Sequence, residues 1–193
     1  MRRLQTFALG LLLVFLSACA ERGLSFNGVD ITGANFGAGF HLTDHTGKAR
    51  QLSDFRGKAV TLFFGYTHCP DFCPTSLAGM REVKRLLGPQ GDRLQVLFVT
   101  VDPARDTQEV LANYVPNFDP SFIGLRGDDA QTAEVGREFK VFFQKVQGKT
   151  PDSYTMDHSA STFVFDPQGR LRLMFKYGME PAAMADDLRK LLG

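Results

Sequence analysis

Two cysteines, Cys69 and Cys73, lie four positions apart in the stretch FFGYTHCPDFCPTS, and each is followed directly by a proline. Thiolates attack disulfides and bind soft metal ions, so this pair could exchange electrons, hold a metal or close a loop. A disulfide across so short a loop stabilises a fold little, because the entropy that it removes from the unfolded chain falls with loop length. A purely structural disulfide is therefore the least favoured of the three functions.

The spacing of the two cysteines leaves both redox and metal chemistry open. Redox pairs of the thioredoxin type have two residues between the cysteines, whereas three residues separate Cys69 from Cys73. This spacing permits a disulfide, and it also allows both sulfur atoms to bind one ion without being joined. Two protein ligands rarely suffice for a metal ion, so the metal hypothesis requires a third side chain from elsewhere in the chain.

His158, in the stretch YTMDHSAST, is the best candidate for a third ligand. It lies directly before a predicted strand, and in a thioredoxin-like arrangement this part of the chain faces the cysteine loop. A set of two thiolates and one imidazole suits Cu(I), or Cu(II) with an additional ligand, and it would also accept zinc. The presence of a histidine there favours a metal centre at Cys69, Cys73 and His158.

Three further residues are candidates for contacts that support such a centre. His68 precedes the first cysteine, but neighbours in an extended segment point in opposite directions, which favours a supporting contact over ligation. Asp102 ends a predicted strand beside the site, where it could support the site or pair with Arg105. Asp157 could orient the histidine that follows it, or it could simply begin a turn.

The elements that must position these residues alternate between strands and helices. We expect strands at 40–52 (two short runs), 58–66, 94–102, 122–127, 141–146, 161–166 and 170–177, and helices at 74–87, 106–115, 128–140 and 180–193. Asp106 and Glu109 predict a capping box for the second helix, and Asp128 predicts the cap of the third. Alternating strands and helices indicate parallel βαβ units, and the last two strands form an antiparallel hairpin. The predicted fold class is α/β and thioredoxin-like, with a central mixed sheet flanked by helices.

The cysteines are expected on the loop and at the entrance of the first helix rather than inside it. A residue before proline is pushed away from the helical region, and Cys73 precedes Pro74. At this place the thiols would face the positive end of the helix dipole, which favours the thiolate.

The N-terminal segment has the features of an export signal. Residues 1–18 combine two arginines with an apolar run that is too short for a typical membrane-spanning helix, although an uncleaved anchor is possible. The stretch LSAC at 16–19 resembles a bacterial lipobox, which predicts lipidation of Cys19; the alternative is an ordinary cleavage point. We expect a lipoprotein-type signal peptide at 1–18, a tether at 19–38 with one short strand near 26–31, and a single domain at 39–193. The protein would be exported and membrane-anchored, facing the periplasm or the cell exterior.

Composition excludes one broad class of partner. The 193 residues include 22 basic and 21 acidic side chains, so the formal net charge is +1, and no basic block follows Arg2 and Arg3. Proteins that bind phosphate backbones need a concentrated positive surface. We therefore expect no nucleic acid partner.

Three ordered motifs make the sequence resemble the Sco/SenC family of copper-binding, thioredoxin-like assembly factors for cytochrome c oxidase. The family pattern G-[YF]-T-x-C-P-x-x-C-P is matched by GYTHCPDFCP, V-D-P-x-R-D-T by VDPARDT, and D-H-S before a strand by DHSAS. The resemblance extends from about residue 40 to the C terminus. It implies copper as the metal and Cys69, Cys73 and His158 as its ligands.

The resemblance also implies a function and a partner. Family members bind Cu(I) and Cu(II) and help to mature the CuA centre of cytochrome c oxidase subunit II, which makes a copper metallochaperone the first hypothesis. The alternative is a membrane-tethered thiol-disulfide reductase that acts on cysteines of the oxidase or of another extracytoplasmic protein, with Cys69 as the attacking thiolate and Cys73 resolving. Another copper chaperone or thiol protein is a further possible partner.

Overall fold

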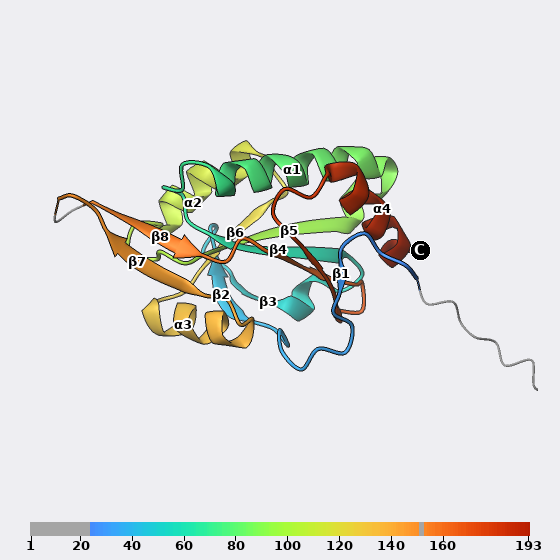
Figure 1. Ribbon diagram of the computed structural model, residues 1–193, viewed down its shortest axis with the longest axis horizontal. Coiled ribbons are helices and arrows are strands. Elements are labelled where there is room, and N and C mark those ends of the chain that lie inside the picture. The colour runs from blue at the N-terminus through green and yellow to red at the C-terminus, as the bar shows by residue number, and fades with distance from the viewer. Residues whose placement is uncertain (1–23, 151–152) are drawn as a thin grey trace, which may run out of the picture.

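An eight-stranded mixed sheet runs through the centre of the structure (Figure 1). The computed structural model describes residues 24–150 and 153–193, so the predicted signal peptide and Cys19 lie outside the described residues. The strands follow the spatial order β1-β10-β9-β4-β5-β6-β2-β3. Their bounds are β1 Val29–Asp30, β2 His41–Asp44, β3 Ala49–Gln51, β4 Ala59–Gly65, β5 Leu94–Thr100, β6 Ile123–Arg126, β9 Thr162–Phe165 and β10 Leu171–Phe175.

The central strands β4, β5 and β6 are parallel to one another. Every residue of β4 and β5 is buried, because helices cover both faces of the sheet, and this explains the nearly continuous apolar runs in their sequences. The hairpin of β9 and β10 adds antiparallel strands beside β4. The predicted mixed sheet is therefore confirmed.

Helices lie on both sides of this sheet, with α1 packed against α4 on one side and α3 on the other (Figure 1). In the described part of the chain the α-helices are α1 Phe72–Leu87, α2 Gln108–Tyr114, α3 Asp129–Glu138 and α4 Pro181–Leu192, and short 3-10 segments occupy Leu52–Phe55, Gly88–Arg93 and Val115–Asn117. Strand β4 contacts both layers: the ring of Phe64 lies 5.5 Å from that of Phe139 at the end of α3, whereas Gly65 faces Cys73 of α1. The carboxyl end of β4 thus lies beside the first turn of α1.

Helix α1 begins earlier than the sequence predicts. It starts at Phe72, so Cys73 is already helical although it precedes Pro74. The amide groups of the first helical turn have no intrahelical acceptor, and a proline there sacrifices no hydrogen bond. The predicted start at residue 74 was wrong by two residues for this reason.

A separate two-stranded sheet projects from the side of the domain (Figure 1). It consists of β7, Phe143–Gln147, and β8, Tyr154–His158, which pair antiparallel so that Phe143 is opposite His158. The sequence predicts β7 within one or two residues, but β8 was missed. Strand β8 is short and has no apolar run, so its sequence gives little indication of a strand. In the structure its half-buried residues, Tyr154, Met156 and His158, alternate with exposed ones.

The described part of the predicted tether follows the surface of the domain. The short strand β1, expected near residues 26–31, pairs with β10. Before it, the backbone N–H groups of Asn27 and Gly28 donate to the buried carboxylate of Asp187 in α4, at 2.7–3.0 Å. Among the described residues, no helix has the length and apolar character needed to cross a membrane.

Candidate metal centre

The two cysteines lie at the turn between β4 and α1. The backbone N–H of Cys69 donates to the carbonyl of Tyr66 at 3.2 Å, which curls the loop, and the N–H of Cys73 points to Sγ of Cys69 at 3.4 Å. Both side chains are buried, and neither belongs to a disulfide. The loop therefore presents two free thiols at the carboxyl end of a central strand, where parallel sheets place their ligands.

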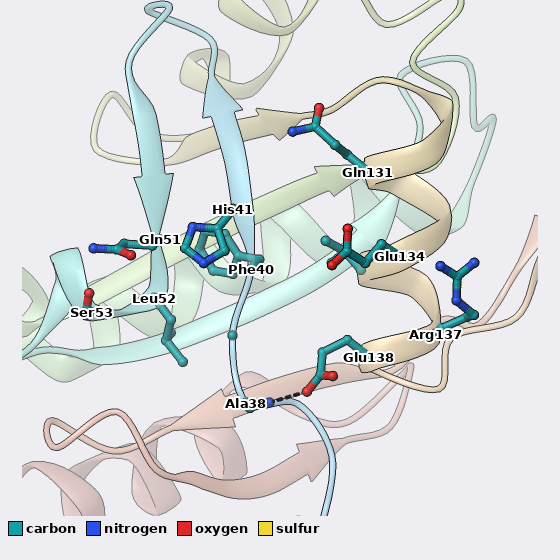
Figure 2. A pocket seen from close by; sticks show the side chains of 12 residues that line it. Ala38, Phe40, His41, Gln51, Leu52, Ser53, Gln131, Glu134, Arg137 and Glu138 are labelled. Atoms are coloured by element: carbon teal, nitrogen blue, oxygen red, sulfur yellow. Dashed lines mark hydrogen bonds between the residues drawn. The ribbon is translucent and has the colours of Figure 1, made fainter.

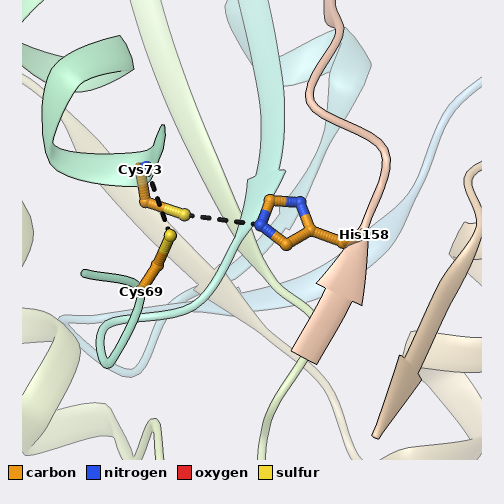
Figure 3. Close-up of side chains that lie close together, drawn as sticks. All are labelled: Cys69, Cys73 and His158. Atoms are coloured by element: carbon orange, nitrogen blue, oxygen red, sulfur yellow. Dashed lines mark hydrogen bonds between the residues drawn. The ribbon is translucent and has the colours of Figure 1, made fainter. Parts of the chain in front are cut away.

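His158 reaches the same place from the last position of β8. Its Nδ1 lies 3.1 Å from the carbonyl oxygen of Ser159, and because a carbonyl can only accept, Nδ1 carries the proton. The lone pair of Nε2 then faces the sulfur of Cys73 at 3.6 Å (Figure 3). The imidazole is thus held in the tautomer that a metal ion requires from Nε2.

The ligand atoms of Cys69, Cys73 and His158 all lie within 4.8 Å of one another (Figure 3). Within residues 24–150 and 153–193, this is the one group of three or more His, Cys, Asp or Glu side chains that is close enough to hold an ion. Two sulfur ligands that are each about 2.3 Å from one ion can be at most about 4.6 Å apart. The three side chains therefore fit a metal ion with little movement.

Burial favours the neutral forms of Cys73 and His158. It raises the pKa of the Cys73 thiol, which opposes the expectation that the helix dipole favours a thiolate there. Burial also lowers the pKa of His158, whose ring meets the rings of Tyr66 and Phe63 at centroid distances of 5.8 and 6.2 Å. A metal ion would displace the thiol proton, whereas the Nε2 lone pair is already free.

A family model described as SCO1/SenC matches residues 29–193, which is most of the chain. The chain belongs to the SCO1/SenC family. The human mitochondrial protein SCO2 homolog is 36% identical over 153 residues, which cover 78% of this chain and 58% of that protein. The chain therefore spans little more than half the length of this curated relative.

Solved structures of SCO1/SenC proteins have the same fold. The structure of Bradyrhizobium japonicum ScoI with copper bound matches with a TM-score of 0.74 at 43% identity, and the match covers 82% of this chain and 99% of that one. The apo Sco1 protein from Thermus thermophilus matches with a TM-score of 0.76 at 39% identity, covering 86% and 97% of the two chains. These matches confirm the resemblance to the Sco/SenC family and the thioredoxin-like fold class.

Two of the predicted supporting residues of this SCO1/SenC chain lie at the surface. His68 is exposed, and its Nδ1 lies 3.2 Å from Oγ1 of Thr67. Asp157 is also exposed; it lies inside β8 opposite Gln144 and does not begin a turn. The contact that orients the histidine comes instead from the carbonyl of Ser159, which the sequence did not indicate.

The third predicted supporting residue, Asp102, is buried but does not contact the three ligands directly. One carboxylate oxygen accepts from Nε of Arg105 at 2.5 Å, and the other accepts from the hydroxyl of Tyr154 at 2.8 Å. Tyr154 begins the strand that ends in His158. The pairing of Asp102 with Arg105 that the sequence suggested is therefore observed, and Asp102 also contacts the strand of the candidate ligand through Tyr154.

The prediction that Asp106 caps the second helix is wrong. Helix α2 is capped by Thr107, whose Oγ1 accepts from the N–H of Val110, and not by Asp106. The buried Asp106 carboxylate instead accepts from the N–H and Oγ1 of Thr67, at 3.0 and 2.6 Å, and from Oγ1 of Thr100 at 2.6 Å. Asp106 thus fixes the start of the cysteine loop of this SCO1/SenC domain.

A groove of about 750 Å³ between α3 and the β2–β3 hairpin is separate from this centre (Figure 2). It contains His41 and the carboxylates of Glu134 and Glu138, and it shares no residue with the cysteine–histidine group. Glu138 already accepts from the backbone N–H of Ala38 at 2.6 Å. These side chains form no group close enough to hold an ion, so the cysteine–histidine centre is the candidate functional site.

Proposed function

We propose that this chain is a copper metallochaperone and that Cys69, Cys73 and His158 bind its copper cargo. The observation that supports this most strongly is the approach of the three ligand atoms to within 4.8 Å of one another. Soft thiolates select Cu(I), and the imidazole also suits Cu(II) when a further ligand is added. The copper-bound state of the B. japonicum relative, at 43% identity, supports copper as the metal.

Loading and release of copper follow from the burial of these ligands. On loading, each thiol gives up its proton to solvent as the sulfur binds the ion, so proton release accompanies binding. Cys73 is fully buried, whereas His158 is only partly buried. An acceptor's thiolate would therefore first replace the histidine and then the cysteines one at a time, and the copper ion would remain bound throughout.

The acceptor that we propose is the CuA centre of cytochrome c oxidase subunit II, in line with the function implied by the family resemblance. We further propose that the chain is exported through its signal peptide at 1–18 and held at the membrane by a lipid on Cys19, facing the periplasm or the cell exterior. The support is the lipobox-like LSAC sequence. A tether would keep the copper carrier at the membrane that contains its acceptor.

Copper titration of the full-length, reduced protein under anaerobic conditions tests the proposal. Cys69→Ser and Cys73→Ser should greatly weaken the binding of Cu(I) and Cu(II), and His158→Ala should greatly weaken Cu(II) binding while leaving both thiols titratable. His41→Ala, in the separate groove, is the matched control and should bind like the wild type. Unchanged Cu(II) affinity in the His158→Ala variant would contradict the proposed ligand set.

A second step of the experiment separates the chaperone from the thiol-disulfide reductase. The copper-loaded protein is mixed with a metal-free CuA fragment whose two cysteines are reduced, and the copper-free, reduced protein is mixed with the same fragment carrying a disulfide. A chaperone loads the reduced fragment with copper. A reductase instead reduces the disulfide without needing His158, and a Cys73→Ser variant then remains joined to the fragment as a mixed disulfide.

A further inference from the structure

The five residues 102–106 contact both parts of the chain that carry the candidate copper ligands. At one end, Asp106 accepts two hydrogen bonds from Thr67, two residues before the first cysteine. At the other end, Asp102 accepts a hydrogen bond from Tyr154, four residues before His158. The turn after β5 therefore lies between the cysteine loop and the strand of the histidine, and it is bonded to both.

Arg105 completes the contact between this turn and β8. Its Nε donates to Asp102, and its Nη1 donates to the backbone carbonyl of Tyr154 at 2.9 Å. The guanidinium carbon lies 3.5 Å from the centre of the Tyr154 ring and 5.7 Å from that of Tyr66. Asp102, Arg105 and Tyr154 thus form a closed cluster in which each residue contacts the other two, through charge, hydrogen bonds and a cation–π contact.

This cluster is important because the histidine-bearing hairpin lies outside the main sheet. Among the described residues, β7 and β8 form hydrogen-bonded ladders only with each other, and all of their residues are exposed or half-buried. Side-chain contacts, such as those of Phe143 and Met156 with the core, therefore attach the hairpin to the domain. Residues i and i+4 of a strand lie on the same face, so Tyr154 and His158 share a face of β8. A contact that fixes the ring and carbonyl of Tyr154 therefore fixes the face of β8 from which His158 projects, while the carbonyl of Ser159 orients the ring itself.

We propose that Arg105 is a positioning residue for His158: by joining Tyr154 to Asp102, it holds the imidazole at binding distance from the two sulfur atoms. This inference rests on the proposed function, in which the three side chains bind copper. Residues that orient a metal ligand without touching the metal typically change metal affinity 10–100-fold when they are replaced. Cu(II) depends on the imidazole more than Cu(I) does, so Cu(II) affinity should fall more.

The test compares Arg105→Met with Arg50→Met, a closely matched control. Arg50 is 21% exposed and pairs through Nε with Asp44, which is 1% exposed; the corresponding values for Arg105 and Asp102 are 22% and 4%. Arg50 also lies over an aromatic ring, that of Phe55 at 5.7 Å, but it is on β3 at the far edge of the sheet. Both substitutions remove a similar ion pair, and only one of these pairs contacts β8.

In the metal-free protein, Arg105→Met should increase amide hydrogen exchange in residues 154–158, and Arg50→Met should not. With copper, Arg105→Met should weaken Cu(II) binding about 10–100-fold and shift the Cu(II) electron paramagnetic resonance spectrum toward that of His158→Ala. Arg105→Lys, which retains a cation beside Asp102, should recover part of the affinity. If Arg105→Met fails to fold, Tyr154→Phe replaces it, because this variant removes only the hydroxyl bond to Asp102.

Two results separate failure of this inference from failure of the proposed function. The first result is an Arg105→Met variant with the copper affinity, the Cu(II) spectrum and the amide exchange of the wild type, while His158→Ala loses Cu(II) binding. This result would overturn only the positioning function of Arg105. A wild-type protein that binds no copper, or a His158→Ala variant that binds Cu(II) normally, would overturn the proposed function itself. In that case faster exchange in β8 would still report the structural contact of Arg105.

Discussion

Gly65 lies so close to the sulfur of Cys73 that a Cβ atom at position 65 would stand 2.7 Å from Sγ. The same atom would come within 2.8 Å of the ring of Phe98 and 2.9 Å of the ring of Phe63. Real side chains do not make such contacts, so one of these neighbours would have to move. The first residue of the motif GYTHCP is therefore a glycine because the end of β4 must pass directly beneath the second cysteine.

Replacement of Gly65 by alanine should consequently displace Cys73 and damage the copper site. The added methyl group overpacks a filled core, which typically costs about 1–3 kcal/mol of unfolding free energy. Urea denaturation measures this loss, and copper titration measures the accompanying loss of affinity. Gly79→Ala is the control, since a Cβ atom there meets no neighbour within 4 Å and alanine favours the helix. A Gly65→Ala protein with normal stability and normal copper binding would refute this account of the motif.

The hydrogen bonds between Thr67 and Asp106 lead to a second prediction. Thr67→Val keeps the shape of the side chain but removes the hydroxyl that donates to Oδ1 of Asp106 at 2.6 Å. A buried carboxylate that loses a donor should lower the unfolding free energy by about 1–3 kcal/mol. Thermal and urea unfolding check this, with the exposed Thr155→Val as the control. Equal stabilities of the two variants would mean that Asp106 does not fix the loop.

Much of the fold could be predicted because burial leaves a local pattern in the sequence. Strand β4 has a continuous apolar run and helix α1 has an apolar period of its own. The predicted cap of α3 at Asp128 was confirmed, and the structure adds Gln131 as its partner in a capping box. Strand β8 was missed because a short, half-exposed strand has only weak alternation. Local pattern therefore identifies the elements that face the core, and it is less reliable for a strand such as β8 in the surface hairpin.

The candidate ligands of the site could be predicted from the sequence, but the contacts that hold them in place could not. The type and spacing of the two cysteines identified them as candidates. His158 was identified by its type together with its place before a predicted strand of the thioredoxin-like arrangement. Asp106, in contrast, occupies a position that is typical of a helix cap. No feature of the neighbouring sequence indicates that its carboxylate contacts a loop 39 positions earlier. The orientation of the imidazole by the carbonyl of Ser159 was equally invisible, because every residue has a carbonyl group.

Lipidation at Cys19 gives a third prediction, which concerns a residue outside the described part of the chain. The full-length protein, expressed in a bacterium that processes lipoproteins and fed an alkyne-labelled fatty acid, should incorporate the label and sediment with membranes. Cys19→Ser should abolish the label, because the thiol is the attachment point. Cys69→Ser is the control and should retain it. Label in the Cys19→Ser variant, or none in the wild type, would reject the predicted anchor.

Acid should destabilise the domain in part through Asp44, which is buried at the end of β2, directly before the turn to β3. Burial alone would raise the pKa of Asp44, but hydrogen bonds from Thr46, Arg50 and the N–H of Lys48 outweigh it and hold the pKa at about 2, below the usual 3.8. A lowered pKa in the folded state means that the ionised carboxylate favours folding. This contribution is complete above about pH 4 and is lost as the pH falls toward 2.

The shift in the pKa of Asp44 sets the size of this contribution. It means that the ionised carboxylate stabilises the folded state by about 2 kcal/mol more than the protonated form does. Urea unfolding at pH 7, 4 and 3 should therefore show a decrease in unfolding free energy that is smaller in Asp44→Asn than in the wild type. Asp166 and Asp119 also have lowered pKa values and should produce the acid dependence that remains in the variant. Asp186→Asn, at an exposed position, is the control substitution. Parallel pH profiles for the wild type and Asp44→Asn would show that the turn does not stabilise the ionised carboxylate.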